Sequence, residues 1–141
     1  MDLTLAEARG IAEDCLRFAG EMNLKPLTVA VLDASGHLKA LLRQDGTSLL
    51  RPEIAQGKAR GAIALGLGSR ALFERAKEQP YFIQSMNALA GGALVPVPGG
   101  VLVKRDGRII GAVGITGDTS DNDEACAVRA IEAAGLTADA G

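Results

Sequence analysis

The sequence has few aromatic residues and almost no histidine. Among 141 residues it contains three Phe, one Tyr, no Trp and a single His, whereas apolar residues make up 48%. Its core must therefore be built from Ala, Val, Leu and Ile side chains that pack closely together. A chain of this length and apolar content supports one core, and we expect residues 1–141 to form a single domain.

Cysteine is also scarce, and clusters of positive charge are absent. Cys15 and Cys126 form no CxxC motif, so we expect two buried free thiols in a cytoplasmic protein and no zinc or redox motif. Fifteen basic and seventeen acidic side chains give a net charge of −2, with no run of Lys and Arg. This balance disfavours nucleic-acid binding.

No apolar run approaches the roughly 20 residues of a transmembrane helix, so we expect no membrane span. Acidic residues at Asp2 and Glu7 occupy the place where a signal peptide needs positive charge, and we expect the mature protein to start here. The Walker A, GxGxxG and GxSxG patterns are missing as well, which gives no support to nucleotide binding or serine hydrolysis.

Hydrophobic spacing and turn residues predict an α+β domain. The expected elements are helix 4–22, strands 27–32 and 37–43, helices 53–65 and 69–77, strands 101–104 and 108–116, and helix 124–134. Residues 81–89 show no clear pattern, and the Gly- and Pro-rich residues 90–100 predict a loop or a broken edge strand. Two hairpins imply a mainly antiparallel sheet of four or five strands flanked by helices. Thr4 and Glu7 predict a capping box for the first helix.

The single histidine, His37, follows a turn at the start of a strand. A lone histidine is more often structural than a ligand. In a functional role, His37 would ligate the metal of haem or of a corrinoid, or would transfer protons.

Four acidic residues lie together at Asp118, Asp121, Asp123 and Glu124. They do not match the ligand pattern of an EF-hand, and carboxylates also suit the N-terminus of the last helix, so we predict no metal site and keep cation binding here as the less favoured alternative.

Three basic residues, Arg43, Arg51 and Lys58, surround the passage from a strand into a helix. They could bind propionates or a carboxylate substrate, or they could form a solvated surface. The glycines at Gly99 and Gly100 permit either close packing or the approach of a ligand to the backbone.

Several segments together resemble the GlcG/HbpS haem-binding family, and they cover almost the whole chain in order. The segments are VAVLDASGHL at 29–38, RQDG at 43–46, IAQGKA at 54–59, PGG at 98–100, GAVGITG at 111–117 and DNDEA at 121–125. The resemblance implies an antiparallel sheet flanked by helices, assembly into dimers or larger oligomers, and binding of haem or a corrinoid in some members. It also extends to a domain fused to some cobalamin adenosyltransferases.

On this resemblance His37 is the candidate axial ligand, and Arg43, Arg51 or Lys58 would pair with carboxylates. The turn at Gly99 and Gly100 would form a pocket wall.

Three functions remain open from the sequence. The first is a cytoplasmic oligomer that binds haem or another tetrapyrrole. The second is a small catabolic enzyme, such as an isomerase, tautomerase or lyase, that acts on a carboxylated or carbonyl compound between subunits. Its proton-transfer candidates are His37, Glu53 and Asp123. The third is a non-catalytic assembly factor that packs against a partner enzyme.

Overall fold

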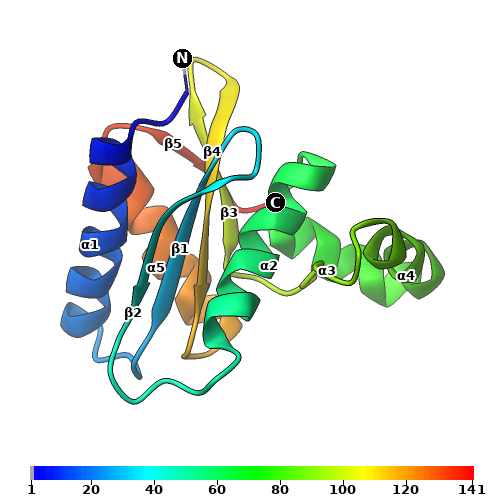
Figure 1. Cartoon of the computed structure of the whole chain (residues 1–141), viewed down its shortest axis with the longest axis horizontal. Helices are drawn as coiled ribbons and strands as arrows, with labels where there is room; N and C mark the ends of the chain where they lie inside the picture. The colour runs from blue at the N-terminus through cyan, green and yellow to red at the C-terminus, as the bar shows by residue number, and fades with distance from the viewer. Residues whose placement is uncertain (1) are drawn as a thin grey trace.

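The computed structural model describes residues 2–141, which form five helices and five strands (Figure 1). In chain order they are α1 (Leu5–Glu21), β1 (Thr28–Asp33), β2 (Leu38–Arg43), α2 (Arg51–Leu65), α3 (Ser69–Glu78), α4 (Pro80–Leu89), β3 (Gly100–Arg105), β4 (Arg108–Thr116), α5 (Ser120–Ala133) and β5 (Thr137–Asp139).

The strands form one sheet in the order β2-β1-β4-β3-β5, and every neighbouring pair is antiparallel. The hairpins β1–β2 and β3–β4 lie side by side because β1 pairs with β4. The predicted α+β class and mainly antiparallel sheet are confirmed.

Helices cover both faces of the sheet. Helices α1 and α5 pack on one face, where alternate strand residues such as Val29, Val31 and Val113 fill the larger core (Figure 1). Helix α2 packs on the other face, and it lies very close to the strands. Burial of these apolar side chains from both faces is the main favourable term in folding.

Small residues explain the close approach of α2. Ala30, Gly114 and Gly100 are paired across β1, β4 and β3, so they form a row of small residues on the face beneath α2. A Cβ atom added at Gly114 would lie 1.9 Å from the carbonyl oxygen of Ala55 in α2. The glycines of β3 and β4 therefore serve helix–sheet packing.

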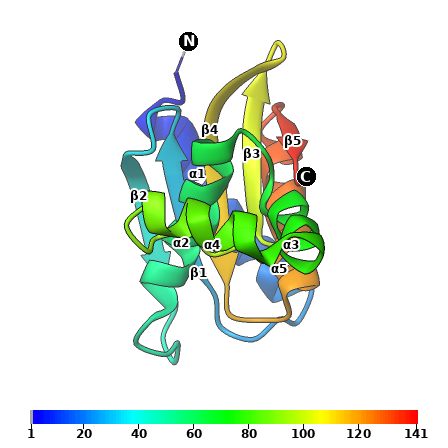
Figure 2. The same ribbon diagram turned by 90° about the vertical axis from the view of Figure 1, so that its right-hand side faces the viewer.

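Helices α3 and α4 extend away from the sheet. Helix α3 packs beside α2, and α4 packs on α3 alone among the described elements. Figures 1 and 2 show α4 as the element farthest from the sheet. Leu72, Ile83 and Leu94 form a small separate core that joins α3, α4 and the segment after α4.

The structure adds two elements to those that the sequence predicts. Helix α4 occupies residues 81–89, for which no pattern was found, because Pro80 both ends α3 and fits the first turn of the next helix. Strand β5 extends the sheet by pairing with Leu102–Lys104. Three residues are too few to leave a recognisable alternation of apolar and polar side chains.

Two helices begin earlier than predicted. Helix α2 begins at Arg51, before its proline, and α5 begins at Ser120. The start of α5 is fixed by Thr119, whose side chain accepts a hydrogen bond from the backbone N–H of Asn122 at 3.2 Å.

Two other local predictions, the capping box and the buried thiols, are confirmed. The capping box of α1 is present, since the Thr4 side chain and the Glu7 side chain each accept the other residue's backbone N–H. Cys15 and Cys126 are free and buried. Across residues 2–141, none of the helices combines the length and the apolar character that crossing a bilayer requires.

Candidate functional site

A cleft of about 430 Å³ lies between helix α2 and the segment that follows α4. We call it the α2 cleft. Its lining residues are Leu32, Gly36, Leu50, Glu53, Ile54, Gln56, Gly57, Arg60, Gly91, Gly92, Ala93 and Val95. The volume lies within the range of about 300–1,000 Å³ that is typical of small-molecule sites.

Glycine shapes the outer wall of the α2 cleft. A Cβ atom added at Gly57 would lie 2.4 Å from a methyl carbon of Val95, so glycine allows the segment after α4 to rest on the helix. Gly91 and Gly92 have φ angles of 69° and 82°, the left-handed region that glycine adopts without strain. The wall therefore depends on Gly91 and Gly92 for its backbone conformation and on Gly57 of α2 for its close contact with the helix.

The α2 cleft combines apolar walls with three polar side chains. Glu53, Gln56 and Arg60 recur at helical spacing along α2, so they share one side of the helix. Glu53 and Arg60 are exposed, and neither takes part in the ion pairs found within residues 2–141. The Arg60 guanidinium is therefore available to an anionic ligand.

Of the residues proposed from the sequence, Glu53 lines the α2 cleft. His37 does not line it, but it directly follows the lining residue Gly36 in the sequence. Gly36 lines the cleft, and the His37 side chain that follows is 81% exposed. Its Nδ1 atom lies 3.7 Å from Oδ1 of Asp33, and its backbone N–H donates to the same oxygen at 3.0 Å. The imidazole is thus accessible from solvent.

Arg43 stands apart from the other candidates. It lies at the end of the edge strand β2, where its guanidinium donates a hydrogen bond to the carbonyl of Thr47 at 2.8 Å. It lines a separate shallow hollow with Gln44 and Asp45. The fold does not bring it to the α2 cleft.

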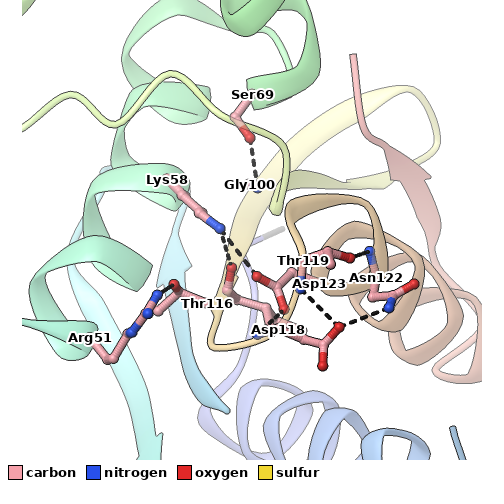
Figure 3. Close-up of polar contacts among 10 residues, drawn as sticks. Arg51, Lys58, Ser69, Gly100, Thr116, Asp118, Thr119, Asn122 and Asp123 are labelled. Atoms are coloured by element: carbon pink, nitrogen blue, oxygen red, sulfur yellow. Dashed lines mark hydrogen bonds and ion pairs between the residues drawn. The ribbon is translucent and has the colours of Figure 1, made fainter. Parts of the chain in front are cut away.

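The remaining candidates gather at the end of β4, beneath α2 (Figure 3). We use the name sheet-end cluster for these candidates, which are Arg51, Lys58, Gly99, Gly100 and Asp123, together with Thr116, which sequence reasoning did not select. Lys58 and Asp123 are only 2% and 1% exposed. The Lys58 ammonium donates to the carbonyl of Ile115 at 2.8 Å and lies 3.4 Å from Oδ2 of Asp123. This ion pair connects α2 to the first turn of α5.

Burial dominates the electrostatics of the sheet-end cluster. Loss of solvent lowers the pKa of Lys58 and raises the pKa of Asp123, and in each case the attraction between the two charges opposes the shift. The other oxygen of Asp123 accepts the backbone N–H of Asp118 at 3.1 Å. Both charges are therefore engaged within the protein.

The glycines and the arginine of the sheet-end cluster also serve internal contacts. A Cβ atom added at Gly99 would lie 2.9 Å from the Lys58 ammonium. A Cβ atom added at Gly100 would lie 2.2 Å from the Lys58 carbonyl oxygen. Arg51 donates to the hydroxyl of Thr116 at 2.8 Å. Instead of walling the α2 cleft, Gly99 and Gly100 make room for Lys58.

The acidic run before and within α5 is occupied by protein contacts. Asp118 accepts hydrogen bonds from the backbone of Lys25, the Asn122 side chain and the backbone of Thr119, which lower its pKa to about 2 (Figure 3). Asp121 and Glu124 pair with Arg70 of α3. Within residues 2–141, no three His, Cys, Asp or Glu side chains are grouped to hold a metal ion.

Sequence reasoning did not select Gln56, Arg60 or the segment 91–95 as site residues. The feature of the sequence that could have identified Arg60 as a site residue is its spacing from Glu53, since residues seven apart share a helix face. That spacing could identify a site only once the buried side of α2 was known. Val95 and its neighbours carried no signal, because the position of a loop depends on tertiary packing.

Comparison with solved structures supports this architecture. The structure of a PduOC:heme complex superposes with a TM-score of 0.86 at 26% identity, covering 96% of this chain and 97% of that one. The structure of HbpS superposes with a TM-score of 0.80 at 27% identity, covering 94% and 89%.

The sequence is similar to proteins of the same kind. Protein GlcG of Escherichia coli K12 is 37% identical over 94 residues, which are 64% of this chain and 63% of GlcG. The corrinoid adenosyltransferase PduO of Citrobacter freundii is 26% identical over 94% of this chain, which spans only 39% of that enzyme. A family model described as "Haem degrading protein HbpS-like" matches residues 3–132. This match covers nearly the whole chain, and the chain therefore belongs to the HbpS-like family.

Proposed function

We propose that this protein binds haem, or a related tetrapyrrole such as a corrinoid, in the α2 cleft. The observation that carries the proposal is an apolar cleft lined by the Arg60 guanidinium, which forms no ion pair within residues 2–141, in a fold whose structural relative PduOC was solved with haem. Fold similarity does not establish function by itself, so the argument rests on the side chains of the cleft.

The α2 cleft fits the two chemical parts of a haem. Leu32, Ile54 and Val95 offer aliphatic walls to a flat apolar ring, in place of aromatic residues, of which the sequence has few. Arg60, rather than Arg43, Arg51 or Lys58, is the cation available to a propionate. The other three basic side chains are engaged in contacts within the protein.

His37 is the axial-ligand candidate of this proposal. It is the single histidine of the chain, and among residues 2–141 no His, Cys, Met or Tyr lines the α2 cleft. Its exposed imidazole at the turn beside Gly36 is free to ligate a metal in its neutral form. Bound haem would supply redox chemistry, while the chain's own residues bind the ring, orient it and limit the access of water.

We further propose that the protein acts as a cytoplasmic homo-oligomer. Leu49, Leu50, Tyr81 and Leu89 are each more than half exposed, and they lie just before α2 and on α4. Exposed apolar residues of this size often mark association surfaces. Because Leu50 also lines the α2 cleft, a second copy that covers these residues would partly enclose a ligand. Light scattering of the purified protein measures the oligomer number.

An absorbance titration with haemin tests the proposed function. We expect a saturable Soret change in the wild-type protein, a shifted band in His37→Ala, and about tenfold weaker binding in Arg60→Ala, because a charge-assisted contact is lost. A time course with a reductant then distinguishes stable binding from haem degradation, since degradation removes the Soret band.

Arg9→Ala is the matched control for Arg60→Ala. Arg9 is an exposed arginine on α1, which covers the opposite face of the sheet. We expect this variant to bind haemin like the wild type. A titration without saturation would refute the proposal, and equal weakening by both arginine variants would refute the role of Arg60.

A further inference from the structure

We propose that Cys15 and Cys126 form an oxidation site, at which a peroxide converts the two thiols into a disulfide that joins α1 to α5. The pair lies on the sheet face opposite α2, among residues of the larger core. The inference is therefore independent of haem binding in the α2 cleft.

The fold brings the two sulfur atoms together from distant parts of the sequence. Cys15 lies in α1 and Cys126 in α5, 111 residues apart, and each is completely buried. The Cys126 thiol donates a hydrogen bond to the carbonyl oxygen of Cys15, with the sulfur 3.0 Å from that oxygen. The two cysteines are thus neighbours without any change in the packing of the helices.

Small side chains surround the pair on both helices. Ala12 and Ala19 lie within a turn of Cys15 on α1, and Ala127 and Ala130 lie close to Cys126 on α5; all four are buried. Alanine allows two helix backbones to approach closely, and a disulfide requires Cα atoms within about 7 Å of each other. Figure 1 shows α1 and α5 side by side on one face of the sheet.

The two thiols differ in acidity, which gives them different roles. The neighbouring Cys15 thiol lowers the pKa of Cys126, whereas the neighbouring Cys126 thiol together with burial raises the pKa of Cys15 well above its usual value. Cys126 therefore reaches the nucleophilic thiolate form more easily. Cys15 is placed to react with the sulfenic acid that forms when Cys126 is oxidised.

The reaction balances in two steps. The Cys126 thiolate attacks one oxygen of hydrogen peroxide, the O–O bond breaks, and Cys126 sulfenic acid and hydroxide form. The Cys15 sulfur then attacks the sulfenic sulfur, and the S–S bond forms as the hydroxyl group leaves with the Cys15 proton as water. Peroxide is reduced and two thiols are oxidised. A thiol reductant reverses the change through exchange.

Peptide mapping after peroxide treatment tests the proposal on the intact folded protein, in the presence of a chelator. Trypsin releases Cys15 in peptide 10–17 and Cys126 in peptide 109–129. We expect these peptides to be linked, with a mass about 2 Da below their sum because two hydrogens are lost. We also expect the midpoint of thermal unfolding to rise by about 5 °C or more, because the disulfide closes a long loop. Dithiothreitol should restore both properties.

Cys15→Ala and Cys126→Ala are the controls. Each should retain the circular dichroism of the wild type and should yield no linked peptide and no rise in the unfolding midpoint. Survival of both free thiols in peroxide would overturn the proposal. Sulfinic acid at Cys126 without linkage, or a disulfide between two chains, would also overturn it.

Discussion

Two charged residues on helix α2, only two positions apart, differ completely in their surroundings. Lys58 points beneath the helix and is 2% exposed, and its ammonium contacts Ile115 and Asp123. Arg60 is exposed on the α2 cleft and forms none of the ion pairs of residues 2–141. A basic residue in a family-like segment is therefore not by itself a ligand-binding residue; burial and partners decide its role.

Glycine shows the same contrast between the two sides of α2. Gly114, beneath the helix, opposes a backbone oxygen, which cannot move without moving the helix. Gly57, at the α2 cleft, opposes the Val95 side chain and the Ala93 carbonyl of a loop. On the sheet side of α2 the helix backbone itself limits the space, whereas on the cleft side the limiting atoms belong to a side chain and a loop carbonyl.

The largest expected effect follows from breaking the buried ion pair. Lys58→Met leaves the Asp123 carboxylate buried without its partner, and we expect the free energy of unfolding to fall by about 3–5 kcal/mol. Urea denaturation measures the change. Molecules that remain folded should bind haemin with the wild-type affinity, since Lys58 does not line the α2 cleft.

A double variant sharpens this prediction. Lys58→Met combined with Asp123→Leu removes both charges, and it should recover much of the lost stability because no unpaired charge remains. If Lys58→Met weakens haemin binding without lowering stability, Lys58 belongs to the ligand site and the contrast between the two sides of α2 is wrong.

An intermediate effect is expected from filling the space beneath α2. In Gly114→Ala the new methyl group would meet the Ala55 carbonyl at 1.9 Å, so α2 must shift, and overpacking of this kind costs about 1–3 kcal/mol. Thermal and urea unfolding report the loss.

Gly10→Ala is the matched control for this substitution. Gly10 lies within α1, where nothing is within 4 Å of an added Cβ atom. Alanine should raise the stability there by about 0.5–1 kcal/mol, because it is the better helix former. Equal effects of the two substitutions would contradict the close packing of α2.

The smallest expected effect is a pH dependence at Asp118, next to the sheet-end cluster. Its folded-state pKa of about 2 lies below the ordinary 3.8, so its contribution to stability is complete above pH 4 and is lost as the pH falls toward 2. Because Asp118 is only partly buried, we expect on the order of 1 kcal/mol. Urea unfolding at several pH values should show a shallower decline between pH 4 and pH 2 in Asp118→Asn. An unchanged decline would contradict the role of its three hydrogen bonds.

The sequence alone predicted most of the fold and part of the candidate site. Local signals were sufficient where neighbouring residues determine the backbone: the capping box at Thr4 and Glu7, and the turns of both hairpins. They failed at α4, where a proline that ends one helix also begins the next. For the site, Glu53 and the neighbourhood of His37 were identified, whereas Arg60 was not.

The sequence by itself determined the α+β class, the antiparallel hairpins and the aliphatic core, because these follow from the period of apolar residues and from the chemistry of turns. Only the tertiary structure decided which charges are buried and which remain free. Lys58 meets Asp123 across 65 residues, and Cys126 meets Cys15 across 111. Such contacts depend on how helices pack on the sheet, and no local pattern records that packing.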